Sequence, residues 1–249
     1  MRKKVIKAPE TNLTLEEKVD NKKDKKIKLQ YFLKKLEENV RLKERQLDYS
    51  KKIRDSVITF ASGPAGSAKT FSACYTLLKL LFEGKIEKII FTKPIKESGE
   101  NLGFLPGGVE DKIGPFMESF VDNCKKMLKE EYITFLIENK YIENRPLAYM
   151  RGCTLDKSGI FLDEAQNCTY EQLILFITRL GENSKMIIAG DVTQRDIEKK
   201  KIALPDFIEM YKNIEGVGVH LFTKEDIVRN PLLVKLTEIY EDWKDKKNL

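Results

Sequence analysis

Histidine is almost absent from this chain, whose 249 residues include only His220. A single histidine excludes His-rich zinc sites and argues against a catalytic pair of His with Ser or Cys. His220 lies in a strand-like run, residues 217–222, and we interpret it as structural. The four cysteines show no C-x-x-C spacing, which favours reduced thiols over a disulfide framework. They are Cys74, Cys124, Cys153 and Cys168.

Long apolar runs are also missing. No stretch approaches the roughly 20 apolar residues that span a bilayer. The basic N-terminus lacks the apolar core of a signal peptide. We therefore expect a cytoplasmic protein with no membrane partner. Apolar residues make up 41% of the chain, which supports a sizeable core in one large domain or two small ones.

Charged residues are abundant, at 34%, and unevenly placed. Residues 1–55 hold 18 Lys and Arg against 10 Asp and Glu, whereas residues 56–249 hold 27 against 29. Residues 1–26 are polar, Lys-rich and without periodicity, so we expect a basic arm that is disordered or loosely docked. Such an arm either binds nucleic-acid phosphates through counterion release or is a solvated tail, and the residues leave both open.

Apolar spacing predicts a helical segment over residues 27–55, with a break near Glu44. From Ser56 onward, short apolar strands alternate with helices, which predicts an α/β fold with a parallel sheet covered on both faces. Residues 94–159 form an insertion that becomes helical at about 114–140. The expected strands are 56–61, 88–92, 160–162, 186–189 and 217–222, and the flanking helices are 69–82 and 231–243.

The most informative segment joins the first predicted strand to the next helix. It matches the P-loop pattern G-x-x-x-x-G-K-[ST] at residues 63–70, except that Ala68 replaces the last glycine. Backbone N–H groups of such a loop, with the positive end of the following helix, bind the phosphates of ATP or GTP. Lys69 would reach the β- and γ-phosphates and Thr70 would bind Mg²⁺. The expected nucleotide-binding residues are Gly63, Pro64, Ala65, Gly66, Ser67, Ala68, Lys69, Thr70 and Phe71.

Ala68 leaves one question open. If its backbone requires a positive φ, alanine costs about 1–2 kcal/mol there. If the residue has near-helical angles, alanine costs little. The competing interpretation of the whole segment is a Gly-Pro turn between a strand and a helix, with no ligand.

Polar residues follow the other predicted strands, and parallel strands end at one edge of a sheet. Asp163 follows a buried strand, where an NTPase places the carboxylate that holds Mg²⁺. Glu164 is then positioned to orient or deprotonate water. These carboxylates could instead favour the start of a helix, although Thr169 and Gln172 already fit a capping box there.

Three further residues are candidates for catalysis. Gln194 follows the fourth strand and could sense the γ-phosphate or position water, or be a turn residue. Arg179 and Arg229 could stabilise charge in the transition state, or be a helix-end and a surface arginine.

The order of these motifs resembles the PhoH family, ATPases related to the motor domain of superfamily 1 helicases. The most specific segments are Leu-Gly-Phe-Leu-Pro-Gly at 102–107 and Leu-Ala-Tyr-Met-Arg-Gly at 147–152. The resemblance spans about residues 46 to 240. Further matching segments are 63–70, 92–94, 162–167, 178–179, 190–194 and 226–229.

The resemblance implies further roles. Gln46 matches a glutamine that reads the adenine edge in related motors, although a surface helix residue is the simpler interpretation. Thr92, Lys93 and Arg151 resemble contacts to a nucleic-acid strand or a neighbouring subunit, and the alternative for them is packing at the phosphate edge or a surface charge. Family members usually carry glycine at the position of Ala68.

The leading hypothesis is a Mg²⁺-dependent ATPase with one RecA-like domain that binds or remodels RNA or another single-stranded nucleic acid. A helicase sandwiches ATP between two such domains, and this chain is too short for two. We therefore expect a homo-oligomer, such as a hexameric ring, in which Arg229 or Arg179 reaches the neighbour's nucleotide. The alternatives are an ATP-gated nucleic-acid-binding or assembly module that hydrolyses poorly and, less favoured, a P-loop kinase for a small metabolite.

Overall fold

The computed structural model describes residues 15–94, 109–192 and 203–228, together with seven single positions between 232 and 243. Within the first two ranges, side chains are described from Asp24 and from Met117 onward. The predicted turn at 102–107, Gln194 and Arg229 lie outside the described residues.

A six-stranded, wholly parallel sheet forms the centre of the described chain, in the order β3-β2-β4-β5-β1-β6. The predicted α/β class is confirmed, and so are five of the strands. The sixth, β3, was not expected, because its three residues include one apolar side chain and it lies at the sheet edge. The strands are β1 (Ile58–Ser62), β2 (Lys88–Thr92), β3 (Ile142–Asn144), β4 (Ser158–Leu162), β5 (Lys185–Gly190) and β6 (Val217–Leu221).

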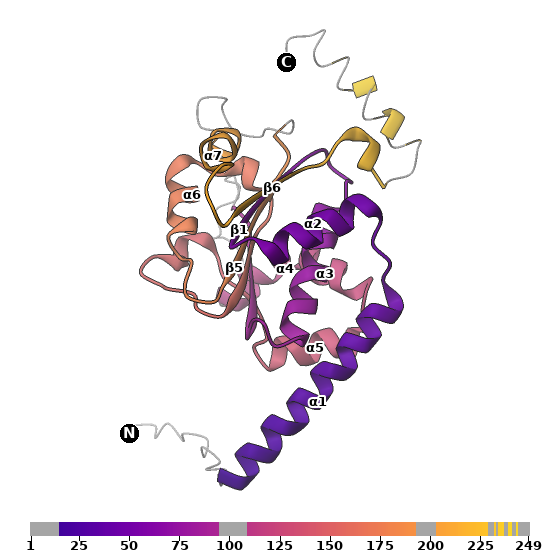
Figure 1. Ribbon diagram of the computed structural model, residues 1–249, viewed down its shortest axis with the longest axis vertical. Coiled ribbons are helices and arrows are strands. Elements are labelled where there is room, and N and C mark those ends of the chain that lie inside the picture. The colour runs from indigo at the N-terminus through magenta and orange to yellow at the C-terminus, as the bar shows by residue number, and fades with distance from the viewer. Residues whose placement is uncertain are drawn as a thin grey trace, which may run out of the picture.

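Helices cover both faces of this sheet (Figure 1). One hydrophobic cluster joins the sheet to α1–α5, and a second joins its other face to α6 and α7. This three-layer arrangement explains why the central strands β1, β4 and β5 are buried almost throughout and mostly apolar. The helices are α1 (Leu15–Asn39), α2 (Glu44–Asp55), α3 (Lys69–Phe82), α4 (Val109–Lys125), α5 (Glu130–Glu138), α6 (Tyr170–Ile177) and α7 (Leu204–Tyr211).

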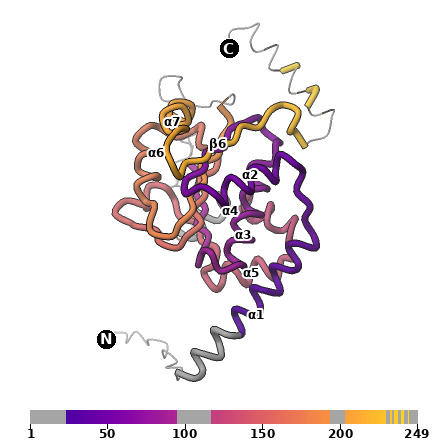
Figure 2. The backbone as a smooth tube through the Cα atoms, in the orientation of Figure 1, coloured from indigo at the N-terminus to yellow at the C-terminus, as the bar shows by residue number. Residues whose placement is uncertain are grey.

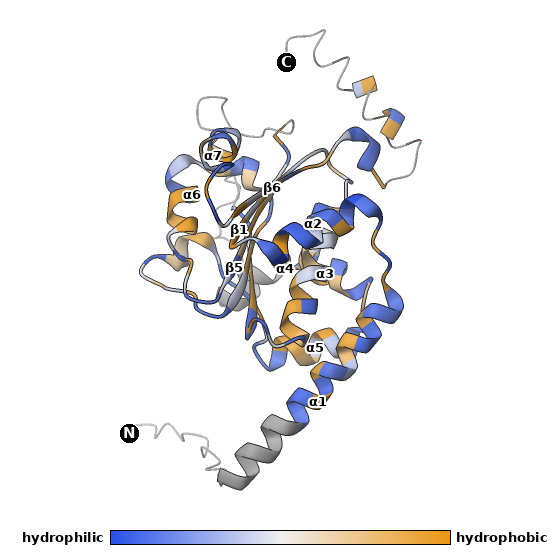
Figure 3. Cartoon of the chain, in the orientation of Figure 1, coloured by the Kyte–Doolittle hydropathy of each residue, from blue (hydrophilic) through white to orange (hydrophobic). Residues whose placement is uncertain are grey.

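Helix α3 lies against the sheet and buries ten of its 14 residues, and much of it has the hydrophobic colour in Figure 3. Its end is fixed by Gly84, whose φ of +71° suits a glycine after a helix. Gly84 N–H donates to Leu81 O, and Lys85 N–H donates to Leu80 O, which is the Schellman pattern. These local signals explain why the predicted bounds of α3 are confirmed.

Helix α1 begins at Leu15, so residues 15–26 are helical where the sequence indicated a segment without regular structure. Many of these residues are Lys, Glu and Leu, which are good helix formers, and the helix is anchored further along by Phe32 and Leu36. Phe32 stacks on Tyr132 of α5 at 4.5 Å between ring centroids. Figure 2 shows α1 running past α3 and α5 before the chain turns into α2.

The expected helix at about 114–140 is two helices. It breaks after Lys125, and α5 begins at Glu130. Among the described residues, no helix is both long and apolar enough to cross a membrane.

Candidate nucleotide site

The carboxyl ends of β1, β4 and β5 meet at one edge of the sheet because the strands are parallel and nearly in register. Ser62 of β1 pairs with Gly190 of β5, and Leu162 of β4 pairs with Ile188 of β5. A cleft of about 640 Å³ opens at this edge, a size suited to a small-molecule ligand. Its lining residues are Arg41, Lys43, Gln46, Ala65, Gly66, Ala68, Lys69, Thr70, Phe71, Asn123, Lys126, Asp163, Glu164, Gly190, Asp191 and Val228.

The loop at 63–70 is held from two sides. Gly63 N–H donates to Gly190 O at 3.3 Å, and Val228 N–H donates to Gly66 O at 2.8 Å. A Cβ on Gly63 would lie 2.5 Å from Phe222 Cβ, so only glycine fits beneath the segment that follows β6. Ser67 is buried, and its hydroxyl donates to Pro64 O at 2.8 Å. Contacts from both sides thus fix this loop, residues 63–70, which we call the cradle.

Ala68 adopts a left-handed backbone, with φ 61° and ψ 28°, directly before α3. The question that the sequence left open is thereby answered, because this is the conformation in which alanine is strained and glycine is not. The alanine therefore costs about 1–2 kcal/mol at the mouth of the cradle.

Lys69 begins α3 and lies over the loop. Its Nζ donates to Gly63 O at 2.6 Å and to Pro64 O at 2.9 Å, and only 9% of the residue is exposed. The ammonium is thus held at the loop, and its phosphate-binding role stays a prediction.

Thr70 and Asp163 are in direct contact. Thr70 Oγ1 donates to Asp163 Oδ2 at 2.8 Å. Burial raises the pKa of Asp163 to about 6, and the negative charge of Glu164 adds to the rise. Lys69 and the hydrogen bond from Thr70 act in the opposite direction.

This pair of oxygens fits Mg²⁺. The described residues hold no group of three or more His, Cys, Asp or Glu that could cage a metal. One carboxylate beside one hydroxyl suits Mg²⁺, which keeps several waters and takes other ligands from substrate phosphates.

Glu164 has a left-handed backbone, with φ 56°, and an exposed side chain that lines the cleft. Its backbone N–H donates to Asp163 Oδ1 at 3.1 Å. Helix α6 is capped by Thr169 and Gln172 as predicted, and at the short helix Ala165–Asn167 before it Glu164 makes no side-chain capping hydrogen bond. The two carboxylates are therefore not needed to start α6.

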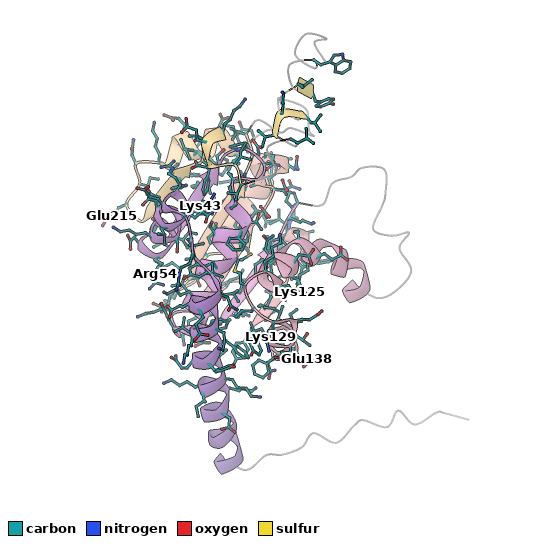
Figure 4. All side chains as sticks on the ribbon, turned by 90° about the vertical axis from the view of Figure 1, so that its right-hand side faces the viewer. Lys43, Arg54, Lys125, Lys129, Glu138 and Glu215 are labelled. Carbon is teal, nitrogen blue, oxygen red and sulfur yellow. The ribbon has the colours of Figure 1, made fainter. Side chains whose placement is uncertain are left out.

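Gln46 is buried beside the cleft, and its Oε1 accepts a hydrogen bond from Lys43 N–H at 3.0 Å. Lys43, labelled in Figure 4, belongs to the connection between α1 and α2. Sequence reasoning missed the other residues that line the cleft on the side of Gln46, because only tertiary packing brings them there. They are Arg41, Lys43, Asn123 and Lys126.

The three predicted contact residues lie outside the cleft lining. Thr92 ends β2, and its backbone O accepts a hydrogen bond from Asp163 N–H at 3.0 Å. Its side chain is fully buried, so the predicted direct contact to a nucleic-acid strand or a neighbouring subunit is not supported. Lys93 is half-buried. Arg151 is exposed, directly after a short helix at Leu147–Met150, and its contact role stays a prediction.

Arg179 is also outside the cleft lining. Its guanidinium donates to the carbonyls of Leu175, Met150 and Cys153 at 3.1 to 3.2 Å. It thereby ties the end of α6 to the segment after Met150, which is a structural role. His220 on β6 is buried against Tyr49 and Phe222, and burial lowers its pKa to about 4, as fits a structural residue.

The sequence of this chain is similar to the sequences of several known proteins. The family model described as PhoH-like protein matches residues 39–241. The PhoH-like protein of Bacillus subtilis is 41% identical over 235 residues, which cover 90% of this chain and 72% of the relative. That of Synechocystis is 42% identical over 198 residues, or 79% of this chain and 60% of the relative. Protein PhoH of Escherichia coli is 36% identical over 200 residues, which cover 79% of this chain and 56% of the relative.

Proposed function

The chain belongs to the PhoH-like family, and we propose that it is a Mg²⁺-dependent ATPase. It spans between 56% and 72% of the length of the relatives compared above. The activity is therefore proposed for this chain alone and not for the whole length of those relatives. The observation that carries the proposal is the contact between Thr70 and Asp163 at the foot of a P-loop whose lysine faces the same cleft.

Each residue then has a role in binding. The amides of the loop and the N-terminus of α3 bind the phosphates, and Lys69 exchanges its two carbonyl partners for phosphate oxygens. Thr70 and Asp163 would hold Mg²⁺, which would supply positive charge to offset the negative charge of the phosphates. Gln46 contacts the adenine through its side-chain amide.

Hydrolysis requires an oriented water. Glu164 is the exposed carboxylate of the cleft, and we assign it the orientation or deprotonation of that water. Gln194 is proposed to sense the γ-phosphate from the segment that follows β5. Because the guanidinium of Arg179 is bound within its own chain, Arg229 is the better candidate for an arginine that reaches a neighbour's nucleotide.

A homo-oligomer and a single-stranded nucleic-acid partner complete the proposal. The described residues form one RecA-like domain, and such domains complete their nucleotide site with a second one. A ring of copies supplies it, and Lys93 and Arg151 are candidate contacts to RNA or single-stranded DNA.

A second candidate function is an ATP-gated assembly module with weak hydrolysis. The left-handed Ala68 favours it, because strain in the cradle can misplace the phosphates. Ala68→Gly distinguishes the two: a strong rise in turnover supports the weakly hydrolysing module, and unchanged turnover supports the ATPase.

The test is phosphate release from ATP by wild type and Glu164→Gln, with and without single-stranded RNA. We expect Glu164→Gln to retain ATP affinity and to lose turnover by about 100-fold or more. Equal turnover in both proteins would contradict the assigned role. Transfer of phosphate to an acceptor other than water would instead favour a kinase.

A further inference from the structure

Gln166 bridges the ends of two strands through its side chain. It lies in the short helix Ala165–Asn167 directly after β4 and is only 2% exposed. Its Nε2 donates to Glu164 Oε2 at 2.6 Å. Its Oε1 accepts the backbone N–H of Asp191, the residue after β5, at 3.0 Å. One carboxamide therefore connects the exposed carboxylate of the cleft to the neighbouring strand.

The end of β5 is shaped around this side chain. A Cβ on Gly190 would lie 2.7 Å from Gln166 Oε1 and 2.8 Å from Gln166 N, closer than real side chains approach. Gly190 also accepts the N–H of Gly63, the first residue of the P-loop. The bridge thus joins Glu164 to a strand end that also contacts the phosphate-binding loop.

Glu164 benefits from such a partner. Its side chain is exposed and long, and a carboxylate that orients water must be held within about 0.5 Å of its working position. A neutral amide supplies a charge-assisted hydrogen bond without adding a charge beside Asp163. Gln166 can do this reproducibly because it is itself buried and bound at both ends.

We propose that Gln166 is a positioning residue for hydrolysis. It holds the Glu164 carboxylate in place and couples it to the end of β5, so that a shift at Asp191 is transmitted to Glu164. This inference rests on the proposed function, in which Glu164 orients the attacking water.

Two substitutions separate the two ends of the bridge. Gln166→Ala removes both hydrogen bonds. Gln166→Glu keeps an acceptor for Asp191 N–H but places a carboxylate against that of Glu164. Gln172→Ala is the matched control, since it removes a capping hydrogen bond from the same segment without touching Glu164. The measurements are kcat, ATP affinity and hydrogen exchange of the Asp191 amide by NMR.

We expect both Gln166 variants to lower kcat by about tenfold or more while ATP affinity changes by less than about twofold. The Asp191 amide should exchange faster in Gln166→Ala and at the wild-type rate in Gln166→Glu. Gln172→Ala should keep the wild-type kcat.

Wild-type kcat in Gln166→Glu would overturn the positioning role, and so would a loss of ATP affinity that matches the loss of kcat. If wild type itself releases no phosphate, the proposed function fails, and exchange at Asp191 still tests the bridge. Unchanged exchange in Gln166→Ala would then overturn the coupling.

Discussion

The hydroxyl of Thr70 donates a hydrogen bond to Asp163 across 2.8 Å, although the two residues are 93 positions apart in the chain. The contact exists because β1 and β4 both flank β5 and end at the same edge of the sheet. It brings the start of α3 and the end of β4 to one point, and the proposed Mg²⁺ site is that point.

Asp163→Asn should stabilise the protein at neutral pH. The pKa of Asp163 is raised from 3.8 to about 6 by burial, so the folded state binds a proton more tightly than the unfolded state between these values. The contribution of Asp163 to the free energy of unfolding therefore falls as the pH rises from about 4 to about 6. Removing the charge should raise the free energy of unfolding at pH 7.5 by up to about 2–3 kcal/mol.

Urea denaturation at pH 7.5 and pH 4 measures this effect. The gain should disappear at pH 4, where the carboxyl is protonated in the folded state. Asp122→Asn, at an exposed position on α4, is the control and should show no such gain. An unstable Asp163→Asn variant at pH 7.5 would contradict the prediction.

Ala68→Gly should stabilise the fold by about 0.5–1 kcal/mol. Relief of the left-handed alanine contributes about 1–2 kcal/mol, and the greater freedom of glycine in the unfolded chain removes part of it. The measurement is the midpoint of urea unfolding. Ala65→Gly is the control, because the backbone of Ala65 is not left-handed, and it should lower the midpoint. An equal decrease of the midpoint in both variants would contradict backbone strain at Ala68.

Gly63→Ala should destabilise the protein by about 1–3 kcal/mol, because the new methyl meets Phe222 at 2.5 Å. Gly84→Ala is the contrast. Its position has a positive φ but nothing within 4 Å, so we expect only about 1 kcal/mol of backbone strain. The measurement is the midpoint of thermal unfolding of the Gly63→Ala and Gly84→Ala variants, with and without ATP. Gly63→Ala should also lose stabilisation by ATP, whereas Gly84→Ala should keep it.

Sequence reasoning predicted the strands and helices around the candidate site well where the signal was local. The P-loop, the bounds of α3 and the position of Asp163 after a buried strand follow from short patterns and from the parallel sheet. It failed where tertiary packing decides. Strand β3 is short, and two of its three residues are polar. Lys126 reaches the cleft only through the placement of α4. The proposed role of Gln166 depends on its hydrogen bond with Asp191, which lies beyond β5. The backbone of Ala68 could not be read from the residue itself.

The most direct test of the central claim is the affinity for ATP with Mg²⁺, measured by titration calorimetry on wild type and Lys69→Ala. We predict that wild type binds ATP and that Lys69→Ala binds it at least about tenfold more weakly, since the ammonium at the cradle entrance is lost. Undiminished affinity in Lys69→Ala would contradict the placement of the triphosphate between Lys69 and Asp163.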